Sequence, residues 1–205
     1  DAATARRDLD SALAEKKQAE IAKRRDAERE AAAIARLVRE ARDLRDLARK
    51  LGQRSQNSQG KSSVTTGSGA FARARGIVPL PVRGTLSTRF GARNENGVAQ
   101  KGIIIAARGG AQVTAPYDAQ VLYSGPFRQY GEIVILGLEG GFQMILAGLE
   151  KADGFVGQDL LAGEPVGILA EGDDLGGSSS GRSQLYMELR YKGDPIDPTP
   201  WLQQG

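Results

Sequence analysis

The stretch Gly131–Leu149, "GEIVILGLEGGFQMILAGL", consists of two apolar runs that are joined by the tetrapeptide Leu138–Gly141. Each run has the length of a β-strand and is rich in Ile, Leu, Val and Phe, which suit a pleated and partly buried surface. The two adjacent glycines between the runs favour a tight turn, because glycine adopts the backbone conformations that hairpin turns require. The stretch therefore predicts a β-hairpin.

Further strand-like runs lie on both sides of this hairpin. They include "VTAPYDAQVLYSG" at 113–125, "GFVGQDLLAGEPVGILAEG" at 154–172 and "SQLYMELRYKGDP" at 183–195. All are short, apolar or alternating, and bounded by Gly, Pro or Asp, which is the pattern of strands separated by turns. Together they predict a mostly antiparallel β domain over residues 77–205.

The N-terminal segment, residues 1–51, predicts a long α-helix that precedes this β domain. It consists almost entirely of Ala, Arg, Lys, Glu, Asp and Leu, and it contains neither Gly nor Pro. Its apolar residues recur at alternating intervals of three and four, which is the spacing of a coiled-coil seam. The seam comprises Ile34, Leu37, Ala41, Leu44, Ala48 and Leu51. Such a helix needs a partner, which could be an antiparallel helix, a second copy or another protein.

Residues 52–76, "GQRSQNSQGKSSVTTGSGAFARARG", predict a flexible linker between the helix and the β domain. They are rich in Gly, Ser, Gln and Thr and lack a hydrophobic period. Such a linker either lets the two parts move independently or folds over the surface of the β domain.

The composition excludes several classes of chemistry. The chain has 205 residues, no Cys and no His, so it lacks both thiolate and imidazole metal ligands and any His-based acid–base group. Its net charge of +3 comes from acidic and basic residues that are interleaved, which argues against nucleic-acid binding. No apolar run approaches the roughly 20 residues of a transmembrane helix.

The order of the motifs resembles one family, the lysostaphin-type (LytM) zinc endopeptidase domain. The resemblance extends over about residues 78–202. It rests on "RFGAR" at 89–93, "KGI" at 101–103, V-x-A-P-x-D-A-x-V from Val113, "AGEPVG" at 162–167 and the closing L-Y-x-E-L-R-x-x-G-x-P-I-D-P-x-x-W-L from Leu185. It implies an antiparallel LytM-type β fold.

Active members of this family carry five metal-binding or catalytic positions, and this chain retains the chemistry of none. The resemblance places Gln100 and Ile104 at the first pair, Gly148 at the middle position, and Gln184 and Tyr186 at the last pair. Catalytic zinc needs three protein ligands from thiolate, imidazole or carboxylate, and Ile has no lone pair to donate. We therefore expect no metal, no cofactor and no peptidase activity.

A helical arm, a polar linker and a degenerate LytM domain together resemble the EnvC-type murein hydrolase activators. The resemblance implies a periplasmic protein of bacterial cell division. Its coiled coil would bind the FtsE–FtsX membrane complex, and its LytM domain would activate an N-acetylmuramoyl-L-alanine amidase that splits septal peptidoglycan.

A peptidase groove that has lost its metal ligands gains an apolar floor, which can receive a helix or loop of a partner. The expected amidase-binding residues are Lys101, Ile104, Tyr130, Tyr186 and Arg190. Each also has a purely structural interpretation. Ile104 could fill the core, Tyr186 could fill the space left by zinc, Tyr130 could be a turn aromatic, and the two charges could be solvated surface groups.

Two other functions remain as alternatives. The β domain could be a peptidoglycan-binding or scaffold module that regulates no enzyme, or it could be a hydrolase with unconventional chemistry. A pull-down with sacculi would detect the first, and zinc-dependent lysis by the purified chain would detect the second.

Overall fold

The computed structural model describes residues 44–58, 69–93, 97–171 and 182–203, and also the positions 16–18, 21, 24, 25, 28, 29 and 32. These N-terminal positions are helical and exposed, as Arg24 and Glu28 illustrate with an ion pair of 3.2 Å one helical turn apart. The sequence predicts a helix over residues 1–51. Its other positions before Leu44 lie outside the described residues, and so does the part of the seam that precedes Leu44.

Antiparallel strands are the predominant secondary structure of the described residues, as the sequence predicted. The sheet has the order β1-β2-β9-β6-β5-β4-β7, with β10 paired to β9 and with β8 paired to both β3 and β6. The strands are β1 Gly84–Thr88, β2 Ile103–Arg108, β3 Gln112–Thr114, β4 Ala119–Pro126, β5 Glu132–Leu138, β6 Phe142–Ala152, β7 Asp159–Leu160, β8 Pro165–Leu169, β9 Arg182–Tyr191 and β10 Asp194–Ile196.

The predicted hairpin is present as β5 and β6. A short 3-10 turn, η2 (Glu139–Gly141), joins the two strands, and Gly140 and Gly141 have φ values of 77° and 83°. This left-handed conformation is why the turn carries two glycines. Pairing from Leu138 with Phe142 to Glu132 with Leu149 places this hairpin at the centre of the sheet.

The main hydrophobic core lies on one face of the sheet. Alternate residues of each strand point into it, among them Ile103 and Ile105 of β2, both of which are fully buried as the alternation predicted. The closing Trp201 stacks on Phe71 with ring centroids 6.1 Å apart, and its indole N–H donates to the Phe71 carbonyl at 3.1 Å.

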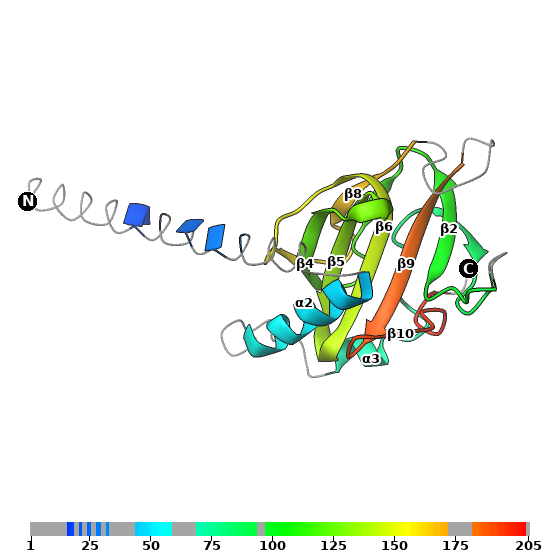
Figure 1. The fold of residues 1–205 in the computed structure, drawn as a ribbon, viewed down its shortest axis with the longest axis horizontal. Coiled ribbons are helices and arrows are strands. Elements are labelled where there is room, and N and C mark those ends of the chain that lie inside the picture. The colour runs from blue at the N-terminus through cyan, green and yellow to red at the C-terminus, as the bar shows by residue number, and fades with distance from the viewer. Residues whose placement is uncertain are drawn as a thin grey trace, which may run out of the picture.

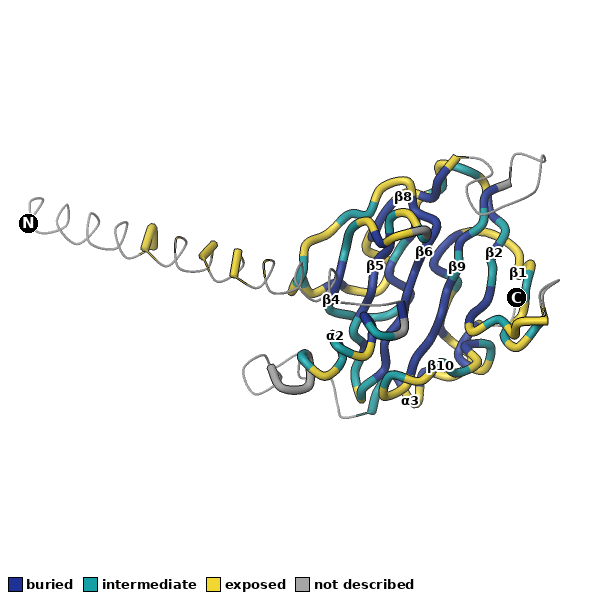
Figure 2. Tube along the Cα trace, viewed as in Figure 1, coloured by how far each residue is buried: buried dark blue, intermediate teal, exposed yellow. Residues whose placement is uncertain are grey.

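Helix α2 (Leu44–Ser58) lies against the opposite face of the sheet. In Figure 1 it crosses β4, β5 and β6, while β9 and β2 continue the sheet beside it. In Figure 2 the strands next to α2 are buried along much of their length. The coiled-coil residues Leu44, Ala48 and Leu51 are buried on this sheet, together with Leu47. The apolar seam at this end therefore pairs with the β domain of the same chain.

The boundaries expected for the linker differ from the structure at both ends. Helix α2 continues through Gly52 to Ser58, and residues 70–73 form a short helix, α3 (Ala70–Arg73), that carries the fully buried Phe71. Glu139 accepts hydrogen bonds from the backbone N–H groups of Gly69 and Ala70 at 3.2 and 3.3 Å. The polar composition of residues 52–76 predicted a linker in spite of Phe71. Burial of this one aromatic side chain is enough to hold the short helix α3 against the β domain. Residues 59–68 lie outside the described residues.

Candidate partner-binding face

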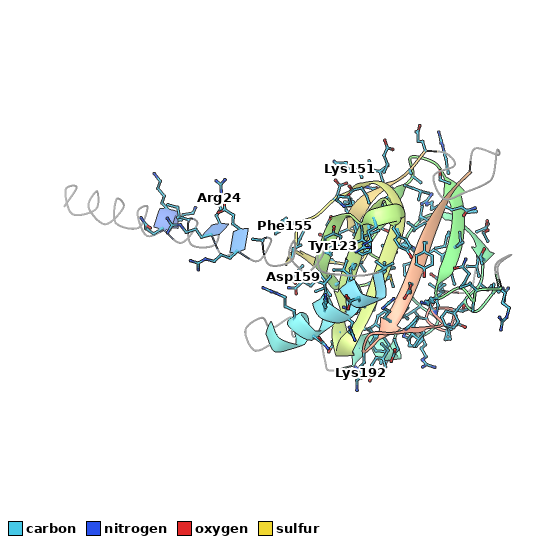
Figure 3. The ribbon with its side chains drawn as sticks, viewed as in Figure 1. Arg24, Tyr123, Lys151, Phe155, Asp159 and Lys192 are labelled. Atoms are coloured by element: carbon cyan, nitrogen blue, oxygen red, sulfur yellow. The ribbon has the colours of Figure 1, made fainter. Side chains whose placement is uncertain are left out.

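The surface under α2 is an apolar part of the sheet, which we call the α2-covered face. It consists of Leu122, Tyr123, Phe127, Ile133, Ile135, Ile145 and Ala147, with Tyr130, Val156 and Tyr186 half-buried at its border. Figure 3 labels Tyr123, which contributes to this face from β4 and donates its hydroxyl to the Pro126 carbonyl at 2.7 Å. Two of the residues expected to receive a partner, Tyr130 and Tyr186, therefore lie at the border of a face that the chain's own helix occupies.

The spacing of apolar residues on α2 explains why it lies on this face. Leu44, Leu47, Ala48 and Leu51 fall on one side of the helix, and all four are almost completely buried. Full burial of a Leu contributes about 1.5 to 3 kcal/mol, so the three leucines stabilise docking by at most roughly 5 to 9 kcal/mol. The outer side carries ion pairs from Asp46 to Arg49 and Lys50, which contribute far less.

One polar contact fixes the position of α2 on the sheet. Gln143 of β6 is buried, and its amide Nε2 donates to the Ala48 carbonyl of α2 at 3.1 Å. A Cβ at Gly52 would lie 3.0 Å from the same Nε2, so the helix approaches the Gln143 side chain closely at that glycine. Sequence reasoning missed both residues. Two sequence features could have identified them: a Gln inside an apolar strand, and a Gly within a helical pattern.

The structure brings together two of the expected site residues. Ile104 of β2 lies in register with Tyr186 of β9, which in turn lies in register with Ala147 of β6. The Tyr186 ring takes the space beside Gly102, where a Cβ would come within 2.9 Å of the ring atoms Cε2 and Cζ. Tyr186 thus packs against Gly102 and also borders the face that α2 covers.

A hydrogen-bonded chain of three side chains runs along β9 on this side of the sheet. The Tyr186 hydroxyl donates to Glu188 Oε2 at 2.5 Å, and the Arg190 guanidinium donates to Glu188 Oε1 at 2.5 Å. Burial and the adjacent Glu188 carboxylate both raise the pKa of the Tyr186 hydroxyl. Tyr186 therefore remains a protonated donor at physiological pH.

The other expected residues differ in their positions. Tyr130 is half-buried in η1 (Arg128–Tyr130) and packs at the border of the α2-covered face. Lys101 is exposed just before β2, which agrees with a charge that is open to a partner. Arg190, however, is only 1% exposed and is bonded to Glu188 and to the Gly193 carbonyl, so it supports the fold from within.

The two positions of the first expected pair, Gln100 and Ile104, do not lie on one strand. β2 starts at Ile103, and Gln100 precedes it in a loop where its backbone exchanges hydrogen bonds with Gly91 and Ala92. The alternation of faces therefore applies from Ile103 onward and does not extend to Gln100. Gly102, the residue directly before β2, has no side chain, and this leaves room for the Tyr186 ring.

The residues at the five positions that the resemblance assigns to the active site do not fit zinc. Ile104 and Gly148 have no donor atom, and the Tyr186 hydroxyl is held in its neutral form by Glu188. Gly148 has a φ of 93° inside β6, and Gln184 pairs with Ala106 across the β2–β9 ladder. Among the described residues, no three His, Cys, Asp or Glu side chains gather in a way that could hold a metal ion.

Comparison with known families identifies the fold family of the β domain. Residues 98–198 match the family model that is described as Peptidase family M23. This segment belongs to peptidase family M23. The M23 segment contains strands β2 to β10 and thus most of the sheet on which α2 lies.

Two curated relatives are named as activators. The chain is 30% identical over 179 residues to the murein hydrolase activator EnvC of Escherichia coli (strain K12), a match covering 84% of this chain and 42% of that protein. It is 29% identical over 125 residues to the murein hydrolase activator NlpD of Salmonella dublin, covering 60% and 31%. The chain thus spans less than half of each relative. These matches confirm the predicted resemblance to murein hydrolase activators with an M23 domain.

A solved structure shares the fold. A putative peptidase M23 from Pseudomonas aeruginosa superposes with a TM-score of 0.51 at 20% identity, over 76% of this chain and 61% of that chain. This likeness supports the M23-type fold of the β domain. Within the part of the chain that the structure describes, no helix has the length and apolar character needed to cross a membrane.

Proposed function

We propose that this chain is a non-enzymatic activator of a peptidoglycan amidase and that it works in the periplasm during septal splitting. The observation that carries the proposal is the α2-covered face, an apolar surface whose border includes Tyr186, one of the positions that the family resemblance assigns to the active site. The relatives named as murein hydrolase activators support a role in regulating cell-wall hydrolysis.

The proposed mechanism is a shift between two states of α2. With α2 on the sheet, the chain's own leucines cover the apolar residues that a partner would contact. When α2 leaves, Tyr186, Tyr130 and the strand residues between them become available to an amphipathic helix or loop of the amidase. The amidase would then be held in an open and active conformation by capture of an inhibitory segment.

The N-terminal helix is the part that would control this shift. We propose that it binds the FtsE–FtsX complex and that movement of the complex pulls α2 away from the sheet. The work needed to undock α2 is limited by the burial of three leucines, which is within the range that binding of another protein can supply.

The test of this function uses one substitution at the border of the α2-covered face, at Tyr186, and one at Ile104, its neighbour across the β2–β9 ladder. Ile104→Glu and Tyr186→Ala should leave the fold intact and abolish the stimulation of dye release from labelled sacculi by a cognate amidase. Exposed Lys151, whose side chain pairs with Asp153, provides the matched control Lys151→Ala, which should stimulate normally. Full stimulation by both variants would refute binding through this face.

A further inference from the structure

Gln143 is a buried polar side chain of β6 that contacts α2 directly. It is 4% exposed, and its Nε2 donates to the Ala48 carbonyl. Among the described residues, its Oε1 is the only buried side-chain polar atom without a hydrogen-bond partner. The bond to a carbonyl fixes the orientation of the amide, because the reversed amide would place two acceptors against each other.

Gly52 of α2 is the residue that faces this unpaired oxygen. A Cβ built on Gly52 would lie 3.0 Å from Gln143 Nε2 and 3.4 Å from Oε1. Glycine is unfavourable inside a helix, so its presence here needs a reason. The reason is close approach, since any large side chain at this position would collide with the buried amide.

We propose that Gln143 selects the helix that occupies the α2-covered face, and that it favours a small hydrogen-bond donor, above all Ser, at the position of Gly52. The preferred partner is a helix with apolar residues spaced like Leu44, Leu47, Ala48 and Leu51, followed directly by that small donor. This inference rests on the proposed function, because it describes the amidase segment that would replace α2.

The unpaired oxygen makes α2 an imperfect occupant of its own site. An unsatisfied buried acceptor destabilises the docked state, whereas a hydroxyl on a Cβ at this position would lie within reach of Oε1. A partner helix that supplies the hydroxyl would therefore bind more tightly than α2 even with the same apolar contacts. This difference lets the partner hold the face once α2 has been displaced.

The decisive experiment compares Gly52→Ser with Gly52→Ala in the full chain by hydrogen exchange of the α2 amides. Both variants add the same Cβ, so crowding against Gln143 is matched, and Ala has the higher helix propensity. If the hydroxyl pairs with Oε1, α2 in Gly52→Ser should open about fivefold less often than in Gly52→Ala. Equal opening, or less opening in Gly52→Ala, would overturn the proposal.

A second background identifies the acceptor of the hydroxyl. A Ser at position 52 could instead donate to the carbonyl of Ala48, four residues earlier in the helix. Gln143→Met keeps the size of the side chain but removes the amide. In that background, the difference between Ser and Ala should disappear if Gln143 is the acceptor. A difference that persists would assign the effect to the helix backbone and contradict a role for Gln143.

Stimulation of the amidase provides the functional arm. A better-held α2 competes more strongly with the partner, so Gly52→Ser should stimulate dye release less than Gly52→Ala. If no variant and no wild-type chain stimulates any amidase, the proposed function fails. The exchange measurements decide the role of Gln143 in either case, because they contain no enzyme.

Discussion

At the residue scale, Tyr186 has a structural role at a position that the family resemblance assigns to the active site. Its ring lies beside Gly102, and its hydroxyl bonds to Glu188, which also receives Arg190. The ring supplies apolar contact beside Gly102, and the hydroxyl satisfies one oxygen of a buried carboxylate. Both interactions need a neutral phenol, so the position combines packing with a fixed protonation state.

The raised pKa of Tyr186 predicts a specific loss of stability at alkaline pH. An unfolded Tyr ionises near about pH 10, whereas the folded Tyr186 keeps its proton to higher pH because of burial and Glu188. Above about pH 10 the unfolded state therefore binds fewer protons, and the free energy of unfolding falls as pH rises. Thermal unfolding between about pH 9 and 11 should show a smaller drop in Tm for Tyr186→Phe than for the wild-type chain.

The control for this measurement lies on the same strand. Tyr191 is 39% exposed, so Tyr191→Phe changes a tyrosine of β9 outside the buried chain of hydrogen bonds. It should retain the wild-type drop in Tm. An unchanged drop in Tyr186→Phe would mean that this hydroxyl does not contribute to the pH dependence.

Sequence reasoning predicted the strand residues better than the charged ones. The alternation along β2 separated buried Ile103 and Ile105 from half-buried Ile104, because neighbours on a strand point to opposite faces. Arg190 was expected to be open to a partner or to solvent, but it is buried and bonded to Glu188. Burial on a shared face depends on the neighbouring strands and on what covers them, which a single strand does not encode.

At the scale of elements, α2 has a seam whose partner the sequence could not identify. Spacing of three and four residues predicts an amphipathic helix with an apolar side, and Leu44, Ala48 and Leu51 confirm that side. It does not distinguish another helix from a sheet, since both offer an apolar surface. Glycine often ends a helix, but α2 continues past Gly52 to Ser58. At Gly52 the helix lies in close contact with the Gln143 side chain.

Weakening α2 docking should make the chain a stronger activator. Leu47→Asp places a carboxylate at a fully buried position in the middle of the helix stripe. Loss of a buried Leu alone costs roughly 2 to 5 kcal/mol, and desolvation of the charge adds to it, so α2 should undock. Dye release from labelled sacculi by a cognate amidase should rise above the wild-type level.

Gln53→Asp is the matched control for this prediction, because Gln53 is exposed on the same helix and the substitution adds the same charge. It should leave stimulation at the wild-type level. If Leu47→Asp exposes the α2 amides to exchange and stimulation nevertheless stays constant, α2 does not limit access to the face.

At the scale of the whole molecule, the chain is anchored just after the segment that follows α2. Phe71 is fully buried among Trp201, Phe142 and Tyr117, on the side of the sheet opposite to α2. Ten residues, 59–68, separate the end of α2 from Gly69, whose N–H is bonded to Glu139. Because Phe71 is anchored in the main core, a force that pulls α2 off the sheet would not be transmitted beyond Phe71. The sheet would stay folded while the α2-covered face becomes exposed.

This arrangement predicts that α2 and the β domain unfold as separate units. Phe71→Ala should lower the free energy of unfolding of the β domain by roughly 3 to 5 kcal/mol, because it leaves a cavity in the aromatic cluster. Leu47→Asp should accelerate exchange in α2 while the amides of β6 and β9 remain protected. Hydrogen exchange across the full chain, with denaturant unfolding of the same variants, measures both effects. If β6 lost protection together with α2 in Leu47→Asp, the two would form one cooperative unit, and pulling on α2 would unfold the domain that has to bind the partner.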